Sequence, residues 1–131
     1  MASLQLVTLL VEDYDSAIDY FVQRLGFDLL EDSHALTNDD HSKRWVIVRP
    51  PHAVTGLLLA QADGDEQTAA LGRQAGDRVG FFLEIDDFDR THERMVASGV
   101  EFVSPPRSEP YGKVAVFRDI SGNRWDLICR D

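Results

Sequence analysis

The sequence predicts an α+β fold in which one βαβββ module occurs twice within a single domain of 131 residues. Two observations support this prediction: an internal repeat, and the same order of strand and helix patterns in each half. The composition is that of an ordinary globular protein, with 44% hydrophobic and 27% charged residues. A chain of this length can bury a core without disulfides or metals.

The repeat starts at an acidic turn that follows a strand. Residues Leu10–Asp15 read Leu-Val-Glu-Asp-Tyr-Asp, and Glu84–Asp89 read Glu-Ile-Asp-Asp-Phe-Asp, at a shift of 74 positions. Two further pairs follow in the same order, at shifts of 73 and 69: Gly26–Leu30 with Gly99–Val103, and Val46–Arg49 with Ala115–Arg118. Two copies with so long a period indicate a duplicated supersecondary unit rather than a solenoid.

The first module spans about residues 4–62. Asp13 or Asp15 can cap a helix over Asp15–Leu25, and Gly26 ends that helix. Strands are predicted on both sides of the helix: Leu4–Val11, Phe27–Glu31, Lys43–Arg49 and Thr55–Ala62.

A linker of about residues 63–77 follows, with a short helix possible at Glu66–Arg73. The second module spans about residues 78–130, with a helix that is capped by Asp87 or Asp89 and ends at Gly99. Its predicted strands are Arg78–Ile85, Val100–Val103, Lys113–Arg118 and Arg124–Cys129. Each helix covers one face of its sheet, so two facing sheets would curve around a cavity.

Composition also limits the partners. The net charge of −10 and the lack of a basic stripe in the sequence argue against nucleic acid. No apolar run approaches the length of a membrane span, so no membrane partner is expected. The single cysteine, Cys129, and the absence of a signal-like N-terminus predict a cytoplasmic protein.

The duplicated βαβββ pattern resembles the vicinal-oxygen-chelate superfamily, which includes glyoxalase I, bleomycin-resistance proteins and extradiol dioxygenases. The resemblance is strongest in residues 11–27 and in the final hairpin, residues 117–127, and it extends from about Leu4 to Arg130. It implies a mixed sheet in each module and a cavity that hosts many different reactions. It also implies a homodimer, because modules in this superfamily often pair across chains.

Metal-dependent relatives hold a divalent ion with four side chains, taken from the first and last strand of each module. The resemblance places these positions at Leu6, near Leu58, at Gly80 and at Asp126. Only Asp126 offers a ligand atom, and catalytic transition-metal sites usually have three or more protein ligands. We therefore expect no metal and no other cofactor. The alternative is a relocated metal that Glu84 and either His34 or His41 would help to bind.

Strand alternation then predicts which side chains line the cavity. We expect apolar walls with a few polar anchors, a lining that suits a small organic ligand. The predicted substrate-binding residues are Leu6, Thr8, Gly80, Phe82, Glu84, Tyr111, Arg124 and Asp126. Asp126 is also the candidate catalytic residue, as a general base; the alternative is a salt bridge to Arg124, Arg118 or Arg44.

The remaining candidates have structural alternatives. Trp45 and Trp125 could stack on an aromatic ligand or pack strand against helix. Pro105 and Pro106 predict a stiff exposed loop, with Tyr111 as a possible lid. Cys129 and the four histidines read as packing or surface residues.

Two functions remain open. One is a metal-independent protein that binds a small organic molecule in the cavity between the sheets, as drug-sequestering relatives do. The other is a lyase, isomerase or dioxygenase-type enzyme that uses a relocated metal or Asp126 as acid or base. A regulatory domain with a vestigial cavity is the third reading.

Overall fold

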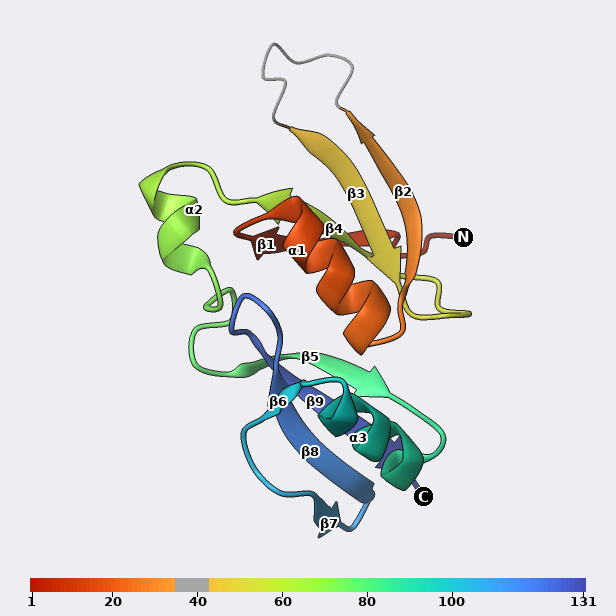
Figure 1. Cartoon of the computed structure of the whole chain (residues 1–131). Helices are drawn as coiled ribbons and strands as arrows, with labels where there is room; N and C mark the ends of the chain where they lie inside the picture. Colours follow the sequence, from red (N-terminus) through yellow and green to blue (C-terminus); the bar gives the residue numbers. More distant parts are fainter. Residues whose placement is uncertain (35–42) are drawn as a thin grey trace. The chain divides into compact units, whose positions relative to one another are not determined.

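A computed structural model of the chain describes residues 1–34 and 43–131 (Figure 1). It divides into two compact units, Met1–Leu71 and Gly72–Asp131, and each is described by itself. The predicted α+β class is confirmed: each unit has a mixed sheet with a helix between its first two strands. His41, a candidate metal ligand, lies outside the described residues.

The sheet of the first unit has the order β1-β4-β3-β2. Its strands are β1 (Leu6–Val11), β2 (Asp28–His34), β3 (Arg44–Arg49) and β4 (Gly56–Gln61). Only the β1–β4 pair is parallel. The predicted helix begins as α1 (Tyr14–Asp19) and continues as a π-helical stretch, Tyr20–Arg24. The linker helix α2 (Gly64–Ala70) starts and ends earlier than expected.

The sheet of the second unit has the order β5-β9-β8-β6, with β7 also paired to β8. The elements are β5 (Val79–Glu84), α3 (Phe88–Ala97), β6 (Glu101–Phe102), β7 (Arg107–Glu109), β8 (Gly112–Arg118) and β9 (Arg124–Arg130). The β5–β9 pair is parallel, as β1–β4 is in the first unit. The two units thus repeat one topology, as the sequence repeat predicts.

Strand β7 corrects the expectation of a plain exposed loop after Pro106. Arg107, Ser108 and Glu109 pair with Val114, Lys113 and Gly112 of β8. This short strand consists of polar residues only, so it lacks the alternation of apolar and polar residues that marks a strand in sequence. Proline next to an edge strand is compatible with such pairing because the edge requires fewer backbone donors.

Both helix starts are capped by the aspartate that directly precedes the aromatic residue of each acidic turn, Asp13 and Asp87. The Asp13 carboxylate accepts a hydrogen bond from the Ser16 backbone N–H at 2.8 Å, and Asp87 accepts one from Arg90 at 3.2 Å. The backbone bond from Ser16 is the main reason that the pKa of Asp13 lies below its usual value. The alternatives Asp15 and Asp89 do not serve as caps.

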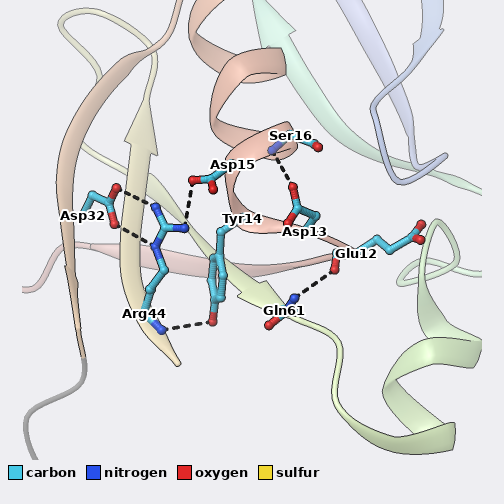
Figure 2. Close-up of polar contacts among 8 residues, drawn as sticks. All are labelled: Glu12, Asp13, Tyr14, Asp15, Ser16, Asp32, Arg44 and Gln61. Carbon is cyan, nitrogen blue, oxygen red and sulfur yellow. Dashed lines mark hydrogen bonds and ion pairs between the residues drawn. The ribbon is translucent and has the colours of Figure 1, made fainter. Parts of the chain in front are cut away.

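In the first unit, the Arg44 side chain connects strand β3 to strand β2 and to helix α1 (Figure 2). Its guanidinium donates to both carboxylate oxygens of Asp32 on β2, at 3.1 and 2.7 Å, and to Asp15 of α1 at 2.9 Å. It also lies 5.2 Å from the centre of the Tyr14 ring, whose hydroxyl accepts the Arg44 backbone N–H. Hydrogen bonding to Asp32 is the main cause that raises the pKa of Arg44.

The core of the second unit is an aromatic layer beneath α3. Trp125 stacks on Phe81 of β5 and on Phe117 of β8, with ring centres 4.7 and 5.6 Å apart. His92 of α3 lies against Phe102 of β6 and Phe88. The structural interpretation therefore holds for Trp125 and His92: both pack the sheet against the helix.

The turn between β8 and β9 is organised by a buried carboxylate. Asp119 accepts three backbone N–H groups, from Ser121, Gly122 and Asn123, and two side-chain donors, Asn123 Nδ2 and Trp125 Nε1. The Trp125 bond is 2.9 Å long. Asp119 therefore fixes both the turn and the indole that anchors the aromatic layer.

Candidate functional site

The second sheet has one covered face and one open face. The register places Phe81, Trp125 and Phe117 in one row, on the face that α3 covers. The next row, Phe82, Asp126 and Val116, must then point to the opposite face, because neighbouring residues alternate along a strand. Phe82 is 67% exposed there, although it is a large apolar side chain at the centre of a strand. We refer to this side of the second sheet as the open face.

Asp126 is the unusual polar group of the open face. Its Oδ1 atom is buried and accepts no hydrogen bond from any described residue. Burial raises the pKa of Asp126, and the positive charge of Arg107 opposes this in part. A buried polar atom without a partner is uncommon in folded proteins, so this one calls for an explanation.

Arg107 is the charged side chain that acts on Asp126, and it also interacts with Glu109 and Tyr111. The Arg107 guanidinium donates to Glu109 at 2.7 Å, and this bond is the main cause of its raised pKa, with smaller contributions from Tyr111 and Asp126. Arg107 and Glu109 belong to β7, so the sequence analysis missed both. Their spacing of two, which places both side chains on one face of a strand, was the only available signal.

The structure thus brings some of the predicted site residues together. Phe82 and Asp126 are register partners on the open face, and Arg107 interacts with both Asp126 and Tyr111. Glu84 lies two residues after Phe82 on β5, on the same face, and forms an ion pair with Arg130 at 3.7 Å. Gly80 and Arg124 lie at the other end of this face, where they line a hollow.

Leu6 and Thr8 belong to the other unit, on β1. Leu9 and Val11 of that strand are buried, whereas Thr8 is exposed. Thr8 and Leu6 therefore lie on the face of β1 opposite to Leu9 and Val11.

The salt bridges proposed for Asp126 are wrong. Arg44 is bound to Asp15 and Asp32. Arg118 pairs with Glu101 at 3.2 Å, and Arg124 donates to the Asp77 carbonyl at 3.2 Å. The charge that Asp126 does face comes from Arg107 instead.

The donor set does not fit the divalent ion of metal-dependent relatives. Leu6, Leu58 and Gly80 have no ligand atoms in their side chains. Within residues 1–34 and 43–131, no three His, Cys, Asp or Glu side chains are grouped as metal ligands would be. Glu84, the suggested replacement ligand, already has Arg130 as a partner.

Trp45 and Cys129 are less buried than their interpretation as packing residues predicts. Trp45 is 42% exposed, so it does not pack strand against helix as Trp125 does. Cys129 is half-buried rather than buried, and its thiol donates to the Asp86 carbonyl at 3.2 Å. Cys129 therefore helps to hold the turn between β5 and α3.

These features define a class of protein. The chain belongs to the Glyoxalase/Bleomycin resistance protein/Dioxygenase superfamily, whose family model matches residues 3–127. It is 50% identical, over 93% of its length and 89% of the relative's, to an uncharacterized protein of Shewanella frigidimarina. None of the helices in the described part of the chain is long and apolar enough to cross a membrane.

Solved structures share the fold. The crystal structure of UcmS2 matches with a TM-score of 0.81 and 29% identity, over 98% of each chain. TnmS3, an antibiotic binding protein from Streptomyces sp. CB03234, matches with a TM-score of 0.77 and 28% identity, over 100% of this chain and 98% of that chain.

Proposed function

We propose that this protein binds a small organic molecule on the open face of the second sheet, without a divalent metal. The single observation that supports this most strongly is the buried Asp126 Oδ1, which lacks a hydrogen-bond donor among the described residues. Leaving such an atom unpaired is unfavourable by about 1–3 kcal/mol. A ligand that donates a hydrogen bond to Asp126 Oδ1 would remove this penalty, which favours ligand binding at this atom.

The surroundings of Asp126 specify the ligand further. Phe82, its register partner, offers an exposed ring for an apolar or aromatic group. Arg107 supplies a positive charge that acts on Asp126, and Tyr111, which interacts with Arg107, supplies a hydroxyl group. The ligand we propose therefore has an N–H or O–H donor beside an aromatic or apolar body. The antibiotic-binding description of TnmS3 supports the same class of ligand.

Leu6 and Thr8 of β1 stay predicted ligand contacts on the sheet of the first unit, where β1 is the counterpart of β5 in the repeated topology. We further propose that the protein is a cytoplasmic homodimer. Exposed apolar side chains on the first sheet, such as Val7 and Trp45, are consistent with a face that a second copy covers.

Catalysis by Asp126 is the second candidate function. A carboxyl group whose pKa is raised by burial holds a proton more strongly than an exposed aspartate does, which favours a role in proton transfer. Binding alone needs only the hydrogen bond. An enzyme would also convert its ligand, and the rate would follow the ionisation of Asp126.

Calorimetric titration with a panel of aromatic antibiotics, bleomycin among them, tests the binding proposal. We expect saturable binding of at least one compound with a donor group, and at least a tenfold weaker affinity in Asp126→Ala, the loss of one hydrogen bond to a charged group. Asp89→Ala, an exposed aspartate of α3, is the matched control and should bind normally. Binding that is unchanged in Asp126→Ala would refute the proposed site, and turnover of the bound compound would favour the enzyme.

A further inference from the structure

Four arginines line one hollow of about 250 Å³ in the second unit, although the protein as a whole has a net charge of −10. They are Arg73 and Arg78 of the segment before β5, Arg118 of β8 and Arg124 of β9. The chain contains only 13 lysines and arginines, so nearly a third of them meet here. Asp77 is the one acidic residue of the lining. The basic patch that is absent from the linear sequence is therefore formed by folding.

The arginines of the two strands are fixed next to each other. Arg118 and Arg124 are register partners in the β8–β9 pair, so their side chains leave the same face of the sheet. One N–H of Arg124 donates to the Asp77 carbonyl at 3.2 Å, which attaches the preceding segment to β9. Arg118 pairs with Glu101 at 3.2 Å, so its charge is partly balanced.

The charges of the other two arginines, Arg73 and Arg78, are not balanced by an ion pair with any described residue. Across the described parts of the chain, the guanidinium groups of Arg73 and Arg78 take part in no hydrogen bond or ion pair. Like charges held around one hollow repel each other, an arrangement that a bound anion would relieve. The guanidinium fork also matches the oxygen atoms of phosphate and carboxylate groups.

Backbone contacts give the hollow its walls. Gly72 packs so closely on the Ser121 carbonyl that a side chain would not fit, and its positive φ of 72° suits glycine. At Gly80, an added Cβ would lie 3.0 Å from Ala75 Cβ, so the segment also closes over the start of β5. The hollow thus lies between the 72–78 segment and the three strands β5, β8 and β9, and Gly122 and Asn123 of the β8–β9 turn complete its lining.

We propose that this hollow binds the phosphoryl group of a small phosphomonoester. The lining carries four positive charges and one negative charge, and a phosphomonoester has about −1.5 to −2 charges at neutral pH, against −1 for a carboxylate. The volume lies just below the usual range for pockets that hold drug-sized ligands, so it admits a small metabolite. The hollow lies at the end of the open face that carries Gly80 and Arg124, and phosphate binding there does not require the ligand proposed at Asp126.

Titrations of the full chain with inorganic phosphate, phenyl phosphate and benzoate test this proposal at matched ionic strength. We expect saturable binding of the phosphates, weaker binding of benzoate, and affinity that falls as salt is added. Tighter binding of phenyl phosphate than of inorganic phosphate would identify an organic ester as the ligand; equal affinities would identify free phosphate. Benzoate binding as tight as phenyl phosphate would overturn the choice of phosphoryl group.

The double variant Arg73→Gln, Arg78→Gln should weaken phosphate binding by at least about tenfold, because it removes two charge-assisted contacts. Neither side chain has a structural partner in the described chain, so the variant should fold. The matched control is Arg90→Gln on α3, which should bind like the unmodified protein. Unchanged affinity in the double variant, equal loss in the control, or no saturable phosphate binding in the millimolar range would each refute the site.

Discussion

Two carboxylates at the end of the chain show how similar residues acquire different roles. Asp119 is buried, as is the Oδ1 atom of the half-buried Asp126, and burial raises the pKa of each carboxyl group. Asp119 accepts five hydrogen bonds, which oppose that rise, whereas Oδ1 of Asp126 accepts none from the described residues. Asp119 is accordingly a structural residue, and Asp126 is available to a ligand.

Asp126→Asn should stabilise the protein at neutral pH. The raised pKa means that the folded state favours the protonated carboxyl, so the wild-type protein loses stability as pH rises from the unfolded pKa through the folded pKa. Asparagine does not ionise, and the pKa of Asp in the unfolded chain is about 3.9. The free energies of unfolding of variant and wild type should therefore be nearly equal below pH ~3. At pH ~7 the variant should be the more stable of the two. Urea unfolding at both pH values measures it; a variant that is less stable at neutral pH would contradict the assignment.

Asp119→Ala should destabilise the protein by at least about 3 kcal/mol, because several buried donors would lose their acceptor and each is unfavourable by about 1–3 kcal/mol. The Trp125 indole N–H and the Asn123 amide are among them. Urea unfolding gives the free energy, and Asp89→Ala, which removes only an exposed ion pair to Lys113, should change it by about 1 kcal/mol or less. A small loss in Asp119→Ala would show that the turn does not depend on this carboxylate.

The sequence predicts some residues and not others for a physical reason. Asp126 could be placed on a face from strand alternation alone, because side chains alternate regularly. The missing hydrogen-bond donor for Asp126 could not be predicted, because it depends on where arginines that are distant in the sequence lie in the fold. Arg118 and Arg124 were reasonable partners by charge, but Glu101 and Asp77 lie closer to them.

At the scale of elements, the strong periodic segments were predictable and the short polar ones were not. Strands β1, β3, β4, β5, β8 and β9 follow apolar runs, and the aspartate directly before the aromatic residue of each acidic turn caps the next helix. Strand β7 has no apolar residue, so only its pairing with β8 reveals it. The π-helical stretch Tyr20–Arg24 lay within a region correctly predicted as helical.

Strand β7 matters to the site because it carries Arg107. Arg107→Gln should raise the pKa of Asp126 further, since the positive charge that opposes the effect of burial is removed. NMR titration of the Asp126 carboxyl carbon measures this, with Arg90→Gln as a control of the same charge change on α3. A pKa that stays constant in Arg107→Gln would show that β7 does not influence the site.

At the scale of the whole molecule, the sequence repeat alone predicts the duplicated topology. The shifts of 74, 73 and 69 residues correspond to equivalent elements, and in both units the first strand pairs in parallel with the last. Function was harder to derive, because this fold supports many chemistries and the site determines which one.

We expect a homodimer in solution, because exposed apolar residues on the first sheet would be covered by a second copy. Sedimentation velocity at micromolar concentration should give a mass of about twice 14.7 kDa. A single species of monomer mass across the accessible concentration range would contradict the dimer.

The most direct measurement of the central claim is a map of ligand-induced amide shifts. In ¹H–¹⁵N spectra recorded with the tightest-binding antibiotic of the panel, we predict the largest shifts at Phe82, Asp126 and Arg107 on the open face, and small shifts along α3. Shifts confined to α3 or to the first unit, with Asp126 unaffected, would contradict ligand binding at the open face.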